Sequence, residues 1–406
     1  MTQTSKKQVI GSSILIAALG YFVDIYDLVL FSIVRIKSLK GIGLPDAELL
    51  SKGVLLLNMQ MAGMLLGGIL WGILGDKKGR LSVLFGSIFL YSAANIANGF
   101  VQTVEVYSVL RFIAGVGLAG ELGAGITLVS EVMDKKSRGY GTMVVATIGI
   151  LGAVVAALVG DLFDWRTAYF IGGGLGLALL IFRISVYESG MFHSAKLKNV
   201  KRGSFSTLFR NRKNIVKYVS CIFIGMPIWY VIGILITFSP EFGKALGMAD
   251  IPDPGKAIMF AYVGLALGDF TSGSFAQIVK SRKKVTAAFI LLTTVFIGSY
   301  LLTRGASLKF FYANCLALGF SIGYWAVFVT IASEQFGTNI RSTVTTTVPN
   351  FVRGAVVPLT FFFQLLKPNF GIIGAAAWVG SVSLFLAVAA LGFLEETHGK
   401  DLDYCE

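Results

Sequence analysis

Long apolar stretches separated by short polar segments run through almost the whole chain. Each stretch is about 20 residues or longer, the length an α-helix needs to cross the hydrocarbon core of a membrane. Stretches this long and this numerous do not fit a water-soluble core. They fall at about 12–36, 52–75, 81–100, 104–130, 140–160, 167–187, 215–239, 257–279, 285–303, 308–332, 343–366 and 371–394. The pattern predicts an all-α integral membrane protein with twelve transmembrane helices.

The first stretch is predicted to be a permanent span and not a cleaved signal. It follows Lys6 and Lys7 and continues to about Ile36 with no A-x-A-like cleavage site. An apolar segment of that length is too long for the core of a signal peptide.

The composition supports a membrane protein and argues against a soluble or nucleic-acid-binding protein. Of the 406 residues, 55% are hydrophobic and only 14% are charged, whereas soluble domains carry roughly 25% charged residues. The net charge of +13 would fit a nucleic-acid partner in a soluble protein. Here the basic residues lie between the apolar stretches, where they set topology and meet anionic lipid headgroups. We therefore predict a lipid bilayer and no nucleic acid as partner.

An even number of spans places both termini on the same side of the membrane. With the N-terminus in the cytoplasm, about twice as many Lys and Arg fall inside as outside, which favours cytoplasmic termini. We expect a multi-pass protein of the plasma membrane. The first outer loop is the exception, with Arg35, Lys37, Lys40 and Lys52.

The two halves of the chain resemble each other. Glu131 and Arg138 follow the fourth span, and Glu334 and Arg341 follow the tenth with the same spacing, about 203 residues later. Such an offset indicates a duplicated carrier-like bundle with a central cavity. We predict a six-helix bundle over 1–190, a basic cytoplasmic linker over 191–213, a pseudo-symmetric second bundle over 214–396 and a cytoplasmic tail over 397–406.

The loop after the second span carries GILGDKKGR at residues 72–80. This segment resembles the major facilitator signature G-x-L-[GA]-D-[RK]-x-G-R-[RK]. The resemblance implies the major facilitator fold and a cytoplasmic gate, whereas the alternative is an ordinary basic loop. The predicted gate contains Gly72, Asp76, Arg80, Glu131, Arg138, Glu334 and Arg341.

The fourth span carries RFIAGVGLAGE at residues 111–121. It is similar to the fourth span of the sugar and metabolite–proton symporter branches of that superfamily. Arg111 and Glu121 lie inside an apolar stretch, where charged groups are costly and tend to face a cavity. The alternative is a structural Arg111–Glu121 pair that holds helices together.

The first span contains two acidic residues on one helix face, Asp24 and Asp27, with Tyr21 one turn before. The segment resembles G-x-x-x-E-x-[YF]-D of the metabolite–proton symporters, with Asp in place of Glu. Two nearby carboxylates in a low-dielectric cavity favour proton binding at one of them. A cation-binding or helix-locking role is the alternative.

The second half offers fewer polar residues within its spans. Asp269 and Arg353 are predicted to lie inside spans eight and eleven, and the offset places Tyr324 and Trp325 at cavity depth, where they are either substrate-stacking or core residues. Pro227 is expected to break the seventh span near Trp229. The predicted substrate and proton path contains Tyr21, Asp24, Asp27, Arg111, Glu121, Trp229, Asp269, Tyr324, Trp325 and Arg353.

No catalytic or metal-binding pattern is present in the sequence, so an enzyme, a metal site and a resident cofactor are not expected. We predict a monomeric secondary transporter that moves a small polar or charged metabolite, such as an organic acid, amino acid or betaine, by proton symport and alternating access. A proton-coupled exporter, an uncoupled facilitator and a non-transporting receptor with a carrier fold are the alternatives.

Overall fold

The computed structural model describes residues 3–78, 80–121, 138–188 and 211–399, and the regular structure in these ranges is helical throughout. The first half contains α1 (Gln3–Gly41), the 3₁₀ helix η1 (Asp46–Glu48), α2 (Leu49–Lys78), α3 (Arg80–Asn98), α4 (Val104–Leu118), α6 (Arg138–Leu162) and α7 (Trp165–Glu188). The second half contains α8 (Arg212–Tyr230), the π-helix η3 (Val231–Ile236), α9 (Ser239–Ala245), α10 (Pro254–Ile278), α11 (Arg282–Leu302), α12 (Leu308–Ser321), α13 (Trp325–Glu334), α14 (Thr338–Gly354) and α15 (Val356–Phe393).

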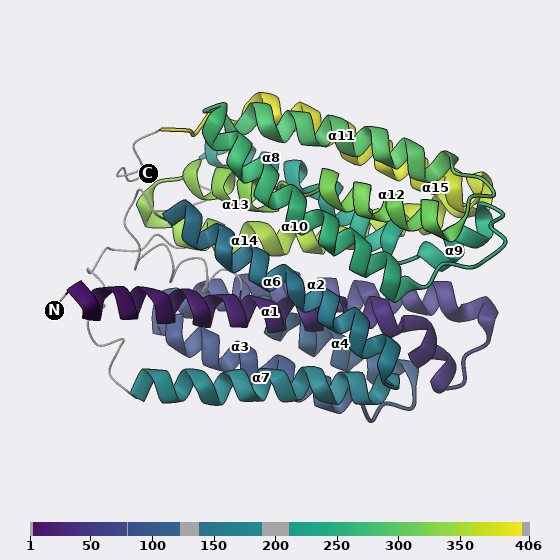
Figure 1. Cartoon of the computed structure of the whole chain (residues 1–406), viewed down its shortest axis with the longest axis horizontal. Coiled ribbons are helices and arrows are strands. Elements are labelled where there is room, and N and C mark those ends of the chain that lie inside the picture. The colour runs from purple at the N-terminus through teal and green to yellow at the C-terminus, as the bar shows by residue number, and fades with distance from the viewer. Residues whose placement is uncertain (1–2, 79, 122–137, 189–210, 400–406) are drawn as a thin grey trace.

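The helices run side by side along the long axis of the molecule (Figure 1). The start of α1 and the end of α15 lie at one end of the bundle, here named the terminus end. The opposite end, which carries α9, is named the far end. The first and the last described helix segments therefore lie at the same end, as an even number of crossings requires.

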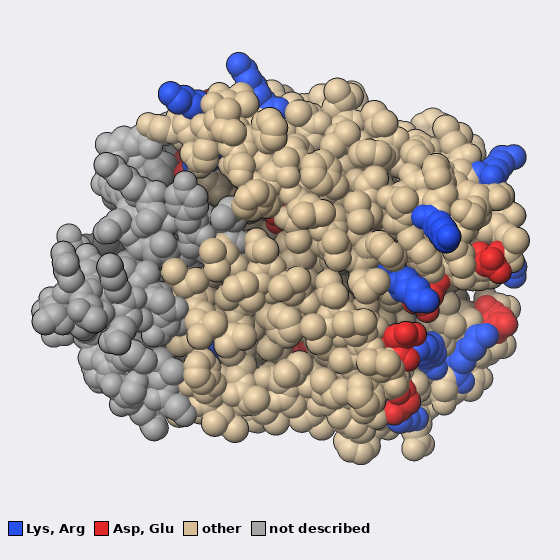
Figure 2. Space-filling model, viewed as in Figure 1, with Lys and Arg blue, Asp and Glu red and all other residues tan. Residues whose placement is uncertain are grey.

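The sides of the bundle have the chemistry of a lipid-facing surface. On the face seen in Figure 2 the middle of the molecule is almost free of charged side chains, which gather mainly at the far end. Large apolar side chains such as Leu162, Ile278 and Phe385 are more than 70% exposed, which is expected where lipid is the solvent.

Eight helical segments in the described ranges are long and apolar enough to cross a membrane. One of them, 343–393, has the length of two spans and bends at Gly371, whose φ is 66°. Two shorter apolar helices cover 83–98 and 147–162. With α4 these segments match the twelve predicted stretches, although α4 is described only to Leu118, so the twelfth span stays a prediction.

Helix packing repeats between the halves. In the first half α2 packs on α4, and in the second α10 packs on α12. The halves join where α2 packs on α14 and where α10 packs on α6. Helix α2 of the first half corresponds to α10 of the second, and α6 corresponds to α14. The contacts α2–α14 and α10–α6 are therefore equivalent, as expected of a duplicated bundle.

Equivalent glycines make the closest of these contacts. A methyl group on Gly115 of α4 would collide with the backbone of α2, and one on Gly319 of α12 would collide with the backbone of α10. Small residues let membrane helices approach this closely. The glycines Gly115 and Gly319 therefore serve helix packing.

Three helices differ from their predicted form. The tenth span is interrupted between Ser321 and Trp325, giving α12 and α13. Pro227 was wrongly expected to break the seventh span: α8 passes through it, and the irregularity is the π-helix η3 that follows. Helix α1 continues to Gly41, so Arg35 lies within a helix and not in an outer loop.

Candidate functional site

A small cavity lies between the halves, near the middle of the bundle. The volume of the cavity is about 20 Å³, which is room for about one water molecule. Pockets that hold a metabolite measure about 300–1,000 Å³. The lining is mostly apolar and comes from both halves: Tyr21, Ile25, Ile150, Ile228, Trp229, Ile232, Tyr262, Leu265, Trp325 and Arg353.

Arg353 is the charged residue of this lining. Its guanidinium is buried and lies 3.4 Å from a carboxylate oxygen of Asp24 on α1. This ion pair joins α14 to α1 across the boundary between the halves. Nε and Nη1 of Arg353 and Oδ1 of Asp24 are buried without a hydrogen-bond partner in the described part of the chain. The pair therefore leaves donors free in the middle of the bundle.

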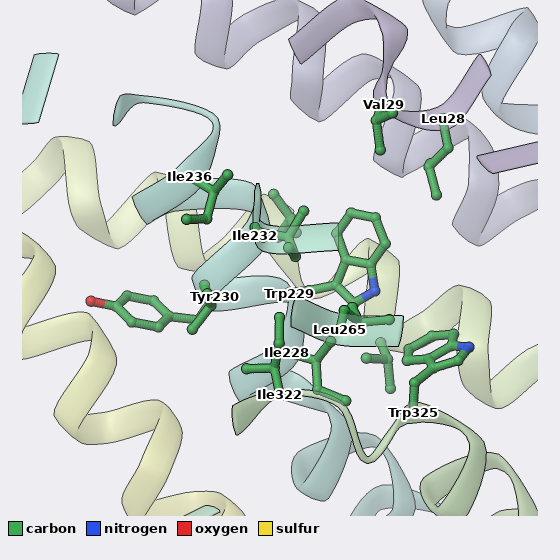
Figure 3. Close-up of a cluster of buried hydrophobic side chains, with 14 of the residues drawn as sticks. Leu28, Val29, Ile228, Trp229, Tyr230, Ile232, Ile236, Leu265, Ile322 and Trp325 are labelled. Carbon is green, nitrogen blue, oxygen red and sulfur yellow. The ribbon is translucent and has the colours of Figure 1, made fainter. Parts of the chain in front are cut away.

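Two tryptophans flank this guanidinium. The indole rings of Trp229 and Trp325 lie 5.9 and 5.7 Å from the guanidinium carbon of Arg353, within the range of cation–π attraction. Figure 3 shows the indoles on neighbouring elements of the second half, while Tyr230 points away from them. Tyr324, predicted to lie at the cavity, instead donates its hydroxyl to the carbonyl of Ile224 and is part of the core.

Asp269 of α10 contacts the start of α13, the helix that begins at Trp325. Its Oδ1 accepts the backbone N–H of Ala326 at 3.0 Å, which places the carboxylate at the start of α13, where backbone donors lack helical partners. Because α13 begins at Trp325, this contact fixes the backbone that carries one of the two indoles. Asp269 is a helix cap in this state and does not line the cavity.

Asp27 and Arg111 lie inside the first half and do not line the cavity. Arg111 donates to the side-chain carbonyl of Gln60 and stacks on Phe31, with 4.9 Å between its guanidinium carbon and the ring. Both carboxylate oxygens of Asp27 are buried without a hydrogen-bond partner in the described residues. The amide of Asn95 and the guanidinium of Arg111 are its polar neighbours.

Glu121 pairs with Arg183 and not with Arg111, the arginine considered in the sequence analysis. Its carboxylate accepts two hydrogen bonds from Arg183 of α7, one of them 3.1 Å long. Arg183 also donates to the carbonyl of Ile16 on α1. The alternative of an Arg111–Glu121 pair is therefore wrong. Arg111 and Glu121 are ten residues apart on one span, and their spacing gave no indication that Arg183 of α7 would pair with Glu121.

The halves are joined at the far end by an ion pair that sequence reasoning missed. Arg35 of α1 is fully buried and makes two contacts of 2.8 Å with the carboxylate of Glu241 on α9. It also donates to the carbonyl of Thr237 and lies over Phe238. The hydroxyls of Thr237 and Ser32 are 3.1 Å apart. The basic charge left unexplained in the first outer loop is thus one side of an inter-half bridge.

A further contact joins the halves between the cavity and the terminus end. The side-chain amide of Asn350 on α14 donates to the carbonyl of Ala119, at 2.9 Å. The cavity is therefore bounded by inter-half contacts on both sides. Together with its small volume, this describes a carrier closed at its centre.

The predicted cytoplasmic gate is only partly visible. Gly72 packs toward the methyl group of Thr347 on α14, 3.7 Å from where a β-carbon would lie. Glu334 pairs with Arg282 inside the second half and not across the halves. The side chains of Asp76, Arg80, Glu131, Arg138 and Arg341 lie outside the described residues, so their gate role stays a prediction.

The terminus end of the second half is held by the segment after α15. Glu395 lies 3.6 and 3.7 Å from the ammonium groups of Lys213 and Lys217. Glu396 accepts the hydroxyl of Ser281 and the backbone N–H groups of Arg282 and Lys283, at the start of α11. Burial acts to raise the pKa of Glu396, but these hydrogen bonds outweigh it and lower the pKa to about 2.

Within the described residues, no group of three or more His, Cys, Asp or Glu side chains has an arrangement that could hold a metal ion. What the centre offers is a guanidinium with free donors, aromatic faces and buried carboxylates. These groups suit reversible binding of a small anionic molecule.

Comparison with known proteins identifies the family of the chain. The family model of the Major Facilitator Superfamily matches residues 9–360. The chain is 25% identical over 410 residues to a cis,cis-muconate transport protein of Acinetobacter baylyi, covering 94% of this chain and 96% of the relative. It is 27% identical over 400 residues to a protein of Cupriavidus pinatubonensis described as a probable 4-methylmuconolactone transporter, covering 94% and 89%.

A further relative is the gentisate transporter of Corynebacterium glutamicum, 23% identical over 365 residues, with 80% of this chain and 81% of the relative covered. Among solved structures, the proton:xylose symporter XylE bound to 6-bromo-6-deoxy-D-glucose superposes with a TM-score of 0.71 over 98% of both chains. Its 16% identity shows a shared fold. The chain belongs to the Major Facilitator Superfamily and is a membrane transporter, not an enzyme.

Proposed function

We propose that the protein carries a small organic anion with one carboxylate, together with a proton, by alternating access. Arg353 carries this proposal, because two of its guanidinium nitrogens are buried at the cavity and have no hydrogen-bond partner among the described residues. A carboxylate accepts two parallel hydrogen bonds from a guanidinium. A bound anion would share or replace the contact that Asp24 now makes.

The rest of the lining supports an apolar body for this anion. Apart from Arg353 and the hydroxyls of Tyr21 and Tyr262, the lining side chains are aliphatic or tryptophan. The faces of Trp229 and Trp325 suit a flat or ring-shaped molecule. A sugar would leave many hydroxyls unpaired in such a lining. A relative named as a gentisate transporter supports a ring-shaped acid with one carboxylate, and one named for cis,cis-muconate, which has two carboxylates, supports an organic acid more broadly.

Proton coupling follows from the charges at the centre. Arg353 and Arg111 lie near Asp24 and Asp27, two positive and two negative groups, whereas the buried Asp269 is held separately by the backbone at the start of α13. An added carboxylate leaves one negative charge in excess, which is costly in a low-dielectric interior. A proton on Asp24 or Asp27 restores neutrality. The proposal is therefore one proton carried with each monocarboxylate.

The moving parts are proposed to be the halves 1–190 and 214–396. The cavity is too small for a metabolite in the closed state, so binding requires separation at one end. Opening the far end breaks the Arg35–Glu241 bridge, and opening the terminus end breaks the Asn350–Ala119 contact. The protein is proposed to act as a monomer with both termini in the cytoplasm.

Counterflow in proteoliposomes tests the function. Purified protein is loaded with unlabelled benzoate, niacin, gentisate or muconate and challenged with the labelled compound, with xylose as a neutral control. We expect exchange of at least one carboxylate and none of xylose. Exchange of xylose alone, or of no carboxylate, would overturn the proposal.

The variant that tests the site is Arg353→Gln. Loss of charged hydrogen bonds worth about 1.5–3 kcal/mol weakens binding by roughly 10- to 150-fold. Arg304→Gln is the matched control, because Arg304 is exposed in the loop before α12. Equal loss in both variants would show that the effect is not specific to the cavity.

A further inference from the structure

One face of α3 carries four buried polar side chains. Tyr91, Ser92, Asn95 and Asn98 are all fully buried, and their spacing places them along one side of the helix over about 10 Å. None of their six side-chain oxygen and nitrogen atoms has a hydrogen-bond partner in the described part of the chain. A helix inside the first half thus presents a continuous polar stripe, here named the α3 stripe.

The α3 stripe adjoins charged groups of three neighbouring helices. The amide of Asn95 lies within hydrogen-bonding reach of Asp27 on α1, although neither side chain makes a well-aligned hydrogen bond within the described residues. Tyr91 lies within electrostatic range of four charged side chains, which are Glu121, Asp27, Arg183 and Asp24. Arg111 lies beside Asp27, and its Nε and Nη1 make no well-aligned hydrogen bond within the described residues.

The backbone of α7 forms the opposite wall. A methyl group on Gly172 would overlap Asp27, and one on Gly176 would overlap Ser92. The glycines therefore bring a smooth backbone surface against Asp27 and the α3 stripe. No apolar side chain of α7 at these two positions separates them.

Within the described residues, ten polar atoms of the stripe, Asp27 and Arg111 are thus buried together without a well-aligned hydrogen bond. A buried polar atom that stays unsatisfied destabilises the folded state, and ten such atoms would outweigh the small net stability of a domain. A buried water molecule makes about three hydrogen bonds to groups of this kind. About three or four water molecules would satisfy the set.

We propose that the α3 stripe holds a file of internal water molecules that relays protons between Asp27 and Glu121, inside the first half and apart from the substrate cavity. The relay rests on the proposed proton-coupled function. The proton leaves the Asp27 carboxyl group for the adjacent water. Tyr91 accepts a proton on its phenol oxygen while releasing its own, and the last transfer ends on the Glu121 carboxylate.

Each transfer conserves atoms and charge and needs no other reactant. A proton on Glu121 weakens its pair with Arg183, whose second contact is the carbonyl of Ile16 on α1. The relay would thereby connect the protonation of Asp27 on α1 to the Arg183–Ile16 contact, which lies about three helical turns closer to the terminus end. Substrate and proton would take separate routes from that centre.

Radiolytic hydroxyl labelling tests for the water without needing a substrate. Bound water generates radicals beside a buried ring, so Tyr91 should be labelled although it is fully buried. Tyr230 is the matched control: it is equally buried, and its hydroxyl is bonded to the carbonyl of Ala376. Faster labelling of Tyr91 supports the water file, and labelling no faster than Tyr230 overturns it.

Transport by Tyr91→Phe and Asn95→Leu tests the relay itself. We expect slower proton-driven uptake with unchanged counterflow, while Tyr230→Phe leaves both unchanged. Unchanged proton-driven uptake in both stripe variants, or parallel loss of uptake and counterflow, would overturn the relay. If the unmodified protein shows no carboxylate counterflow, the proposed function fails, while the labelling result still decides whether the water is present.

Discussion

The Arg35 guanidinium and the Glu241 carboxylate form a two-point ion pair across the halves, with both nitrogen–oxygen contacts at 2.8 Å. Arg35 is fully buried and Glu241 is 19% exposed. Breaking a buried pair from one side leaves an uncompensated charge, at a cost of about 3–5 kcal/mol. The pair therefore stabilises the state in which the far end is closed.

Glu241→Gln should open the far end. The unpaired Arg35 regains water only when the halves separate there, so the equilibrium shifts toward the open state. Hydrogen exchange should become faster in the end of α1 and in η3 and α9.

The control for this variant is Lys40→Gln, which removes an exposed pair with Asp46. Exposed pairs contribute only about 0–1 kcal/mol. Equal rates of hydrogen exchange in Glu241→Gln, Lys40→Gln and the unmodified protein would show that the Arg35–Glu241 pair does not stabilise the closed state.

Asp27→Asn should separate transport from proton coupling. The amide cannot bind or release a proton, so uptake driven by a pH gradient should be lost. Counterflow of the substrate needs no net proton movement and should persist. Asp250→Asn, in an exposed loop, is the control. Retained proton-driven uptake by Asp27→Asn would remove this residue from the coupling mechanism.

The sequence predicted the fold well because hydropathy over about 20 residues is a local property. The positions of the spans follow from such patterns, and the repeated spacing of Glu131 and Arg138 in Glu334 and Arg341 indicated the duplication. The break between α12 and α13 was not predicted, because its polar partner, Asp269, lies on another helix. Hydropathy also gave no signal for the π-helix after α8.

Residue partners were harder to predict than positions. Tyr21, Trp229, Trp325 and Arg353 do line one cavity, as spans of a duplicated bundle should. The partners of Arg35 and Glu121 lie 206 and 62 residues away in sequence, and a single sequence carries no record of such contacts. Buried charge was visible in the sequence, but the pairing that decides its role was not.

Asp269→Asn should retain transport. Its Oδ1 caps α13 by accepting the N–H of Ala326, and an amide oxygen does the same. Asp269→Leu removes the cap, costs about 0.5–2 kcal/mol and frees the backbone that carries Trp325. Binding should weaken in the Leu variant, and melting temperature and counterflow measure both effects. Loss of proton-driven uptake in the Asn variant would instead support the proton-path role predicted from the sequence.

Glu396 should make stability depend on pH at the terminus end. Its pKa is lowered from 4.5 to about 2 by hydrogen bonds from Ser281 and the start of α11, which outweigh the opposing effect of burial. A lowered pKa stabilises the folded state above the unfolded value of about 4.5, and that stabilisation is lost as the pH falls toward 2. Because Glu396 is largely exposed, the contribution should be no more than about 1 kcal/mol. The melting temperature of detergent-solubilised protein should therefore exceed that of Glu396→Gln by a constant amount above pH 5, and the difference should narrow below pH 4.5. A difference that does not change with pH would show that the charge of Glu396 does not stabilise the start of α11.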